Sequence, residues 1–412
     1  MADEDREKPV EDPSVRKGLE MLAELEKGPW PSHVSELKKG TYPIEAYAKG
    51  LGQGLPPWFS GSARISCEFT GFIARRTKDG KQTELHFRVY HPSGQFYRTE
   101  ELRRLLDFAD KFGLGSVETV GQTGDLIVPI RPELADPAVD ELRALGTDIG
   151  GTGDSIRDSA ACVGPAMCEY ALFDSLAARD FFFRYPAFYD KLSTQLFPFK
   201  IKLKFSACPM DCARAVHRAD FGFVGYWEGA PEVDQAVLRT KLEANEVSWK
   251  GLAAGCPAKA IRWDPAKREL VIDGAKCQKS MNCIRKAFPA IRAGPQRKIA
   301  FMVGGHSKGR WGPKMAKPVA LLDDYRSAGE FMSRMIDYWS DRSPHKDRLG
   351  DLIVKEGFPQ MLDRFKDSLP SSPAGKAAGA PRIVTSSVLS EAERAAFAEW
   401  ADAIAREYEG GG

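Results

Sequence analysis

Four cysteines in the middle of the chain form two spaced pairs that could hold a metal cofactor. Cys162 and Cys168 lie in the sequence CVGPAMC, and Cys208 and Cys212 lie in CPMDC. Four thiolates that converge from two loops suit a four-iron, four-sulfur cluster, which takes soft ligands at its corners. Structural zinc favours cysteine pairs two to four residues apart, and the first pair is spaced more widely. The pattern therefore favours an iron–sulfur cluster over a zinc site or four unrelated buried cysteines.

A run of alternating lysines leads into the second pair. The sequence FKIKLKF over 199–205 places Lys200, Lys202 and Lys204 at every second position. On a β-strand these three side chains share one face. Taken alone, the run would be a solvated strand face. The strand runs directly into Cys208, however, and a cationic face beside a redox cluster suits an anionic substrate.

The composition is that of a globular chain without a general affinity for polyanions. Of 412 residues, 43% are hydrophobic and 28% are charged, and the formal net charge is only +2. Anion binding must therefore come from local groups of Lys and Arg. No apolar run approaches the roughly 20 residues that span a bilayer, and the acidic start MADEDREKPVEDPSV is unlike a secretory signal. We expect a cytoplasmic protein with no membrane insertion and no nucleic-acid partner.

The order of the predicted elements indicates an α+β fold with mixed sheets and flanking helices. Strand and helix patterns alternate from 62 to 130, with one helix over 99–113, and helices dominate from 326 to 366. A compact segment that carries the last three cysteines interrupts this pattern. We predict five parts: an N-terminal tail and helical segment (1–60), a first core part (61–233), an insertion (234–295), a second core part (296–366), and a linker with a C-terminal helix (367–412).

These motifs resemble one known family. The two cysteine pairs, with the lysine run before the second, are similar to the siroheme-binding half of sulfite and nitrite reductases. The phrases EKGPWPS, IRDSAACVGPAMCEYA, KFSACPMDCA and YWSDRSPHKDRLGDLI resemble the alpha subunit of dissimilatory sulfite reductases. The resemblance covers roughly residues 20–365. It implies the siroheme sulfite reductase fold, a siroheme coupled to the 4Fe–4S cluster, and a ferredoxin-like insertion.

The resemblance also assigns the cluster ligands. They are Cys162, Cys168, Cys208 and Cys212. Cys212 matches the thiolate that also bridges to the siroheme iron, so it would bind both cofactors. Arg75 and Arg76 are candidates for contact with the siroheme carboxylates. Cys67, inside an alternating strand pattern, is expected to be a core thiol.

Basic residues that match the anion site of the family form a second group. Arg157, just ahead of Cys162, matches the arginine that contacts the sulfite oxyanion. Lys200 and Lys202 match a lysine pair that charges the site and supplies protons, and Lys204 could share that role. Arg88 matches a further anion-binding arginine. These groups would stabilise negative charge and promote loss of oxygen as water.

The insertion departs from the family pattern at one position. A ferredoxin module typically offers one cysteine before a proline and three more in the pattern C-x2-C-x2-C. Cys256 matches the first, and Cys277 and Cys283 match the outer two of the three, but Ser280 stands between them. Serine holds its proton more tightly than a thiol and is a poor ligand at neutral pH. Three outcomes stay open: a cluster with Ser280 or water as fourth ligand, a three-iron cluster, or no cluster.

Together these features predict an oxidoreductase subunit of sulfur metabolism. We expect a six-electron interconversion of sulfite and sulfide, in which the siroheme supplies the difficult redox chemistry. The implied partners are a homologous beta subunit in an α2β2 heterotetramer, a small sulfur-carrier protein and electron donors. Two alternatives stay open: a non-catalytic scaffold and electron-relay subunit of the same complex, and a nitrite reductase. Both the reductive and the sulfur-oxidising direction agree with these residues.

Overall fold

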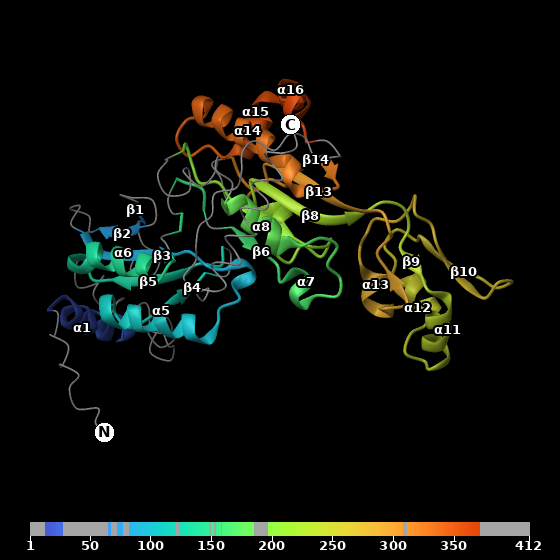
Figure 1. Cartoon of the computed structure of the whole chain (residues 1–412), viewed down its shortest axis with the longest axis horizontal. Helices are drawn as coiled ribbons and strands as arrows, with labels where there is room; N and C mark the ends of the chain where they lie inside the picture. The colour runs from blue at the N-terminus through green and yellow to red at the C-terminus, as the bar shows by residue number, and fades with distance from the viewer. Residues whose placement is uncertain are drawn as a thin grey trace.

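Two five-stranded sheets organise the chain, with helices against them and a small module at one end (Figure 1). The structure, a computed structural model, describes residues 13–27, 65–66, 72–76, 82–120, 123–147, 150–151, 154–157, 159–184, 197–307 and 311–370. The predicted C-terminal helix lies outside these residues. Among the helices described, none has both the length and the apolar character needed to cross a membrane.

The first sheet is antiparallel throughout, in the order β1-β2-β3-β5-β4. Its strands are β1 (Ile65–Ser66), β2 (Phe72–Arg76), β3 (Gln82–Val89), β4 (Glu118–Thr119) and β5 (Leu126–Ile130). The helices of this part of the chain are α1 (Pro13–Lys27), α5 (Thr99–Phe112) and α6 (Ala135–Ala144).

Helix α5 covers this sheet because its apolar residues recur at helical spacing. Leu105, Phe108, Ala109 and Phe112 are all buried, and they share a hydrophobic cluster with strand residues such as Val128. Spacings of three and four residues place such side chains on one face of a helix. The helix predicted over 99–113 is therefore present, and Gly113 is its C-cap.

The second sheet is mixed, in the order β14-β13-β8-β7-β6. Strands β6, β7 and β8 run parallel, while β8, β13 and β14 are antiparallel neighbours. The strands are β6 (Ala160–Ala161), β7 (Leu203–Ser206), β8 (Phe221–Trp227), β13 (Arg297–Val303) and β14 (Lys317–Leu322). The α-helices of this half are α7 (Gly164–Met167), α8 (Ser175–Arg184), α10 (Ala215–Arg218), α14 (Gly329–Arg342), α15 (Leu349–Glu356) and α16 (Phe358–Arg364).

Aromatic side chains fill the core between this sheet and its helices. The ring centroids of Phe205 and Phe223 are 4.9 Å apart, and Phe223 lies 5.0 Å from Phe301 on the next strand. Phe182 of α8 and Phe331 of α14 extend the same cluster. Pairs at such distances contribute about 0.5–1.5 kcal/mol each beyond the area that they bury. The core thus fixes β7 and β8, the strands that lead to the cysteine and lysine motifs.

The small module is inserted between two paired strands. Trp227, the last residue of β8, pairs with Arg297, the first residue of β13. The N–H of Glu228 donates to the Gln296 carbonyl oxygen at 2.9 Å, so the chain leaves and re-enters the sheet at one point. Figure 1 shows the module extending away from the second sheet. Its elements are β9 (Glu232–Val233), α11 (Gln235–Glu243), α12 (Trp249–Ala254), β10 (Ile261–Asp264), β11 (Glu269–Ile272), α13 (Asn282–Ala287) and β12 (Ile291–Arg292).

The module has a hydrophobic core of its own. Leu238, Leu252, Leu270 and Ile284 are buried together in it. This cluster is distinct from the aromatic core of the second sheet. The α+β class is confirmed, with helices and mixed sheets in the main body, whereas the exact boundaries of the five predicted parts stay a prediction.

Candidate functional site

The first two cysteine loops leave neighbouring strands at the same edge of the second sheet. Cys162 follows β6 directly, and Cys208 lies shortly after the end of β7. Because these two strands are parallel, their carboxyl ends meet at one edge. The N–H of Ala207 accordingly donates a hydrogen bond to the Sγ atom of Cys162 at 3.1 Å.

Short turns place the other two cysteines of this set. Cys168 ends helix α7, where its N–H donates to the Gly164 carbonyl oxygen at 3.0 Å. Cys212 follows a turn in which the N–H of Asp211 donates to the Cys208 carbonyl oxygen at 3.2 Å. The side chain of Cys212 is exposed, while that of Cys208 is buried.

The four thiols lie within electrostatic reach of one another. The pKa of Cys208 is raised to about 11, first by burial and then by the neighbouring thiols of Cys168, Cys212 and Cys162. The pKa of Cys212 is raised by burial and by Cys162 and Cys168. The structure therefore brings together the four cysteines that the sequence pattern paired.

This set of donors suits an iron–sulfur cluster. Four thiolates from two loops are the usual ligands of such clusters, and hydrogen bonds to the sulfurs, like that from Ala207, tune the reduction potential. Bound metal would deprotonate these thiols despite their raised pKa values. In the part of the chain that the structure describes, no three side chains of His, Cys, Asp or Glu lie close enough to hold a single metal ion.

Basic side chains gather around Lys202. The pKa of its amine is lowered to about 7, first by burial and then by Lys200, Arg348, Lys204 and Arg157. Three of these four neighbours are residues that the sequence analysis selected. A buried group of like charges disfavours its own protonation and attracts an anion. The arrangement can hold a small anion and exchange a proton with it near neutral pH.

The lysine run is only partly a regular strand. β7 begins at Leu203, although Ile201 still forms a parallel bridge with Ile156. The strand starts later than predicted because the N–H of Lys202 donates to a carboxylate, Oδ2 of Asp220, at 2.8 Å and not to a neighbouring strand.

Lys204 is more deeply buried than Lys200 and Lys202. Its relative exposure is only 2%, so the alternative of a solvated strand face is wrong for this residue. The pKa of Lys204 is lowered to about 8, first by burial and then by Arg214 and Arg218, while Asp211 and Asp125 oppose the shift. Lys204 therefore lies within electrostatic reach of the second cysteine loop and of Asp125, just ahead of β5.

Arg157 and Arg88 have different surroundings. The N–H of Arg157 donates to the carbonyl oxygen of Ile201 at 2.8 Å, which places this arginine beside the lysine run. Arg88 is buried on β3, where its guanidinium pairs with Asp125 and donates to Oγ1 of Thr123 at 3.4 Å. A carboxylate of the first sheet thus balances the charge of Arg88, and its role in anion binding stays a prediction.

Arg75 and Arg76 are on β2, which is separated from β5 by β3. Their side chains lie outside what the structure describes, as does Cys67. Contact of the two arginines with a siroheme stays a prediction.

The three cysteines of the insertion line one pocket. Cys256, Cys277 and Cys283 share it with Ser280 and with apolar side chains that include Trp227. Burial raises the pKa of Cys283 to about 11, and Cys277 and Cys256 raise it as well. The N–H of Ala260 donates to the Sγ atom of Cys256 at 3.3 Å.

Ser280 differs from these cysteines in exposure. It is exposed, whereas the three thiols are partly buried. The pocket therefore offers three sulfur ligands and, at its rim, one hydroxyl that is open to water. An iron–sulfur cluster fits this donor set at three corners, and water could complete the fourth.

Some residues near the lysines were missed by sequence reasoning. Asp220, Arg214, Arg218 and Arg348 all act on the lysine run. Arg348 belongs to the phrase YWSDRSPHKDRLGDLI, but it lies 128 residues from Asp220, its partner, so no local pattern could join them. Arg214 and Arg218 follow the second cysteine pair at helical spacing, a signal that could have been used.

Comparison with known proteins agrees with this geometry. The model of the nitrite and sulphite reductase 4Fe-4S domain matches residues 152–371, the range that holds the cysteine loops, the lysine run and the insertion. The chain is 28% identical over 390 residues to the alpha subunit of the dissimilatory-type sulfite reductase of Nitratidesulfovibrio vulgaris, covering 83% of this chain and 88% of that one. It is 29% identical over 370 residues to the corresponding subunit of Allochromatium vinosum, with the same coverage.

A solved structure supports the fold. The chain matches the crystal structure of dissimilatory sulfite reductase I with a TM-score of 0.69 and 22% identity, covering 88% of this chain and 93% of that one. The family model spans more than half of the chain, and it contains every cysteine and lysine that the structure brings together here. The chain is therefore a member of the nitrite and sulphite reductase family with a 4Fe-4S domain.

Proposed function

We propose that this chain is the alpha subunit of a dissimilatory-type sulfite reductase that interconverts sulfite and sulfide. One observation carries the proposal. The four cysteines lie near one another at one edge of the second sheet, and a buried group of basic side chains surrounds Lys202, just before β7 of the same sheet. Cys162, Cys168, Cys208 and Cys212 would hold the 4Fe–4S cluster. The similarity to two alpha subunits along most of the chain supports the same assignment.

The basic group would bind and orient the substrate. Arg157, Lys200 and Lys202 would attract sulfite and stabilise its negative charge. Lys202, with a pKa of about 7, can give up a proton at neutral pH and so assist the loss of oxygen as water. A siroheme, which would be bridged through Cys212, supplies the iron centre for the six-electron chemistry when bound.

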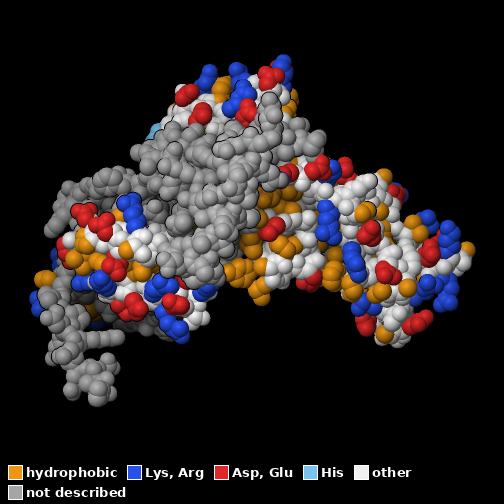
Figure 2. Space-filling model, in the orientation of Figure 1, with side chains coloured by type: hydrophobic (Ala, Val, Ile, Leu, Met, Phe, Trp, Pro, Cys, Tyr) orange, Lys and Arg blue, Asp and Glu red, His pale blue; other side chains and the backbone are white. Residues whose placement is uncertain are grey.

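We propose a homologous beta subunit as partner. The chain is 20% identical over 282 residues to the beta subunit of the dissimilatory-type sulfite reductase of Archaeoglobus fulgidus, so the two subunit types are related. Val163, Met167 and Met210 are exposed on the cysteine loops, and Figure 2 shows hydrophobic side chains gathered in the middle of this face. Exposed apolar residues in one place are typical of an interface. An α2β2 assembly in the cytoplasm would agree with these features.

One experiment tests the whole assignment. The chain is purified together with its beta-type partner, and its absorption spectrum, iron content and sulfite-dependent oxidation of a reduced viologen dye are measured. We expect siroheme bands, about four irons per chain from the first cluster besides the siroheme iron, and turnover that is lost in Lys202→Met. The control is Lys298→Met. It removes a lysine of β13 whose amine pairs with Asp323, directly after β14. A complex without siroheme bands would end the proposal, and turnover with nitrite but not sulfite would reassign the substrate.

We further propose that the insertion holds a second cluster with three cysteine ligands and one iron open to water at Ser280. An open iron is lost easily on oxidation, since no thiolate retains it. Ser280→Cys should therefore raise the iron content of air-exposed protein towards about eight per chain besides siroheme, with the EPR signal of a three-iron cluster replaced by that of a four-iron cluster. Ser248→Cys, at the N-cap of α12 and outside the pocket, is the control. Equal iron content in wild type and Ser280→Cys would contradict this proposal.

A further inference from the structure

Asp220 contacts both the N–H and the carbonyl oxygen of Lys202. The N–H of Lys202 donates to Oδ2 of Asp220 at 2.8 Å. In return, the carbonyl oxygen of Lys202 accepts the N–H groups of Asp220 at 2.9 Å and of Phe221 at 3.1 Å. Asp220 thus takes the place of a strand partner at the point where β7 has not yet begun. The direction in which the Lys202 side chain leaves the backbone depends on this contact.

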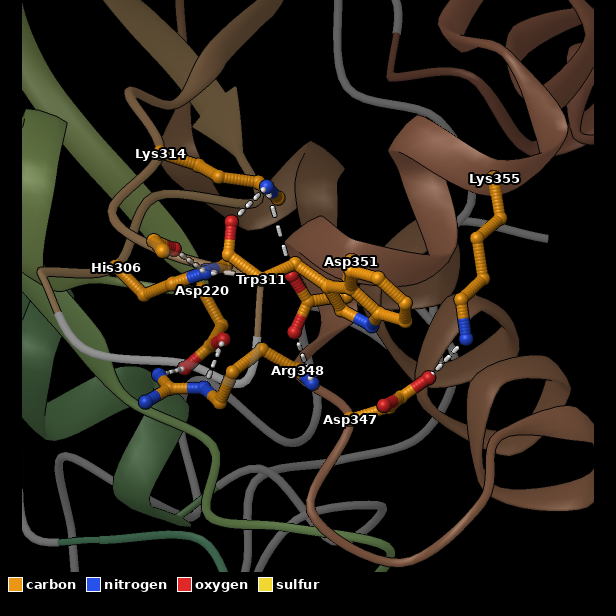
Figure 3. Close-up of polar contacts among 9 residues, drawn as sticks. Asp220, His306, Trp311, Lys314, Asp347, Arg348, Asp351 and Lys355 are labelled. Atoms are coloured by element: carbon orange, nitrogen blue, oxygen red, sulfur yellow. Dashed lines mark hydrogen bonds and ion pairs between the residues drawn. The ribbon is translucent and has the colours of Figure 1, made fainter.

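Asp220 is held in turn by an arginine from the other end of the chain. Arg348 donates to both carboxylate oxygens, from Nε to Oδ1 at 3.2 Å and from Nη2 to Oδ2 at 2.5 Å. Figure 3 shows the two side chains facing each other, with Arg348 coming from the start of α15. Asp220 is fully buried and Arg348 is 2% exposed. A bidentate pair of this kind fixes both position and orientation.

The start of α15 is itself fixed. The N–H of Arg348 donates to Oδ2 of Asp351 at 2.9 Å, and Oδ1 of Asp351 lies 3.6 Å from both His306 and Lys314 (Figure 3). The backbone of Arg348 is therefore anchored at the start of α15, and its side chain reaches from this anchored position to Asp220.

The same pair sets the charge near Lys202. Lys200 and Lys204 face the Lys202 amine from its own segment, Arg157 from the segment before β6, and Arg348 from α15. Asp220, at the start of β8, offsets Arg348, and His306 from the loop after β13 faces both members of the pair. Loss of Asp220 would leave Arg348 unopposed, whereas loss of Arg348 would leave an unpaired carboxylate.

We propose that Asp220 and Arg348 are positioning residues for Lys202: they orient its side chain toward the bound anion and balance the charge around it, without touching substrate themselves. The proposal rests on the proposed function, in which Lys202 binds sulfite. It assigns to α15 a direct part in shaping the anion site.

Because of this charge balance, two substitutions should shift the pKa of Lys202 in opposite directions. In Asp220→Asn, Arg348 should lower the pKa of Lys202, and the pH at which kcat/KM for sulfite falls should drop by about one unit. In Arg348→Met, the free carboxylate should raise that pH by about one unit. Arg348→Lys keeps the charge but loses the bidentate contact, so we expect an unchanged pH profile with a KM for sulfite raised about tenfold. A purely structural role would lower activity in all three without opposite shifts.

A second readout does not depend on turnover. The rate at which acetic anhydride labels Lys202 in the full complex is followed against pH by mass spectrometry, which gives the pKa of this amine directly. The control is Asp347→Asn, which breaks the ion pair between buried Asp347 and exposed Lys355, next to Arg348 in sequence. The pKa of Lys202 and the KM for sulfite should match wild type in this variant.

Different results would refute the proposed function and the positioning role of Asp220 and Arg348. If wild type lacks sulfite turnover but the labelling pKa of Lys202 still moves in opposite directions, the proposed function is wrong and the positioning role stands. If wild type turns over sulfite but Asp220→Asn and Arg348→Met leave the pKa of Lys202 and the pH profile unmoved, or shift both the same way, the positioning role is overturned. If either variant fails to take up siroheme, Arg348→Lys replaces it as the test. Its KM for sulfite and its pH profile then decide between the positioning role and a purely structural one.

Discussion

Single residues of the lysine run combine function with a cost in stability. Lys204 is 2% exposed, and its pKa is lowered to about 8 mainly by burial. A buried amine that is harder to protonate than in water weakens the folded state wherever the unfolded chain would carry the proton.

We predict that Lys204→Met stabilises the chain while it impairs sulfite binding. The folded pKa of about 8 lies below the unfolded value of 10.5, so the unfolded state binds more protons between these values and stability rises with pH across that window. The variant should lose this slope and gain on the order of 2 kcal/mol at pH 7. Denaturant unfolding at pH 7 and pH 10 measures both effects. A variant that is less stable than wild type at pH 7 would show that Lys204 gains more from Asp211 and Asp125 than burial costs.

At the scale of elements, β8 passes very close to the second cysteine loop. A Cβ atom at Gly225 would collide with the carbonyl group of Ala207 and lie 3.1 Å from the backbone nitrogen of Cys208. Because Gly225 has no side chain, the loop can cross β8 at the point where the proposed cluster ligands begin. Glycine is required here for close approach and not for its backbone freedom.

Gly225→Ala is expected to displace this loop and destabilise the chain by about 1–3 kcal/mol, the usual cost of overpacking. Because Cys208 moves with the loop, the iron content of the first cluster should fall as well. Thermal unfolding and iron analysis check the two effects. Gly251→Ala is the matched control, since its new Cβ would meet only Ser248 atoms at 3.7 Å or more within α12. Equal behaviour of both variants would refute the close-approach argument.

Local patterns predicted helix α5 and the approach of the two cysteine loops. Helix α5 followed from the spacing of its apolar residues, and Cys162 lies beside the second loop, where the Ala207 N–H donates to its Sγ atom. The pattern could not show that Asp220 would replace a strand partner of Lys202, since hydrogen bonds to a side chain leave no periodic trace. The pairing of Asp220 with Arg348 was also invisible, because it joins positions 128 residues apart in sequence. Alternation predicted a strand that is longer than β7, and the roles of its lysines stay a prediction.

At the scale of the whole molecule, the insertion can be separated from the sheet that carries it. Replacing residues 229–295 by Asn-Gly should close β8 and β13 into a two-residue hairpin, since Glu228 and Gln296 are already hydrogen-bonded. Trp227 is changed to Thr in the same variant, because its indole is buried in the core of the module. We expect a folded chain that keeps siroheme and about four irons of the first cluster. Circular dichroism and iron analysis test this, and an unfolded product would show that the module is needed for folding.

The module also packs against the first cysteine loops. Phe288 of the insertion meets Tyr170 edge-on at 5.4 Å, and Cys208 belongs to the same hydrophobic cluster as Leu252 and Ile284. An electron passing from one proposed cluster to the other would therefore travel through packed side chains. Because Cys208 is buried in this packing, we expect the shortened chain described above to bleach in air sooner than wild type. The same apolar contact would then serve both as the route for electrons and as a barrier to dioxygen.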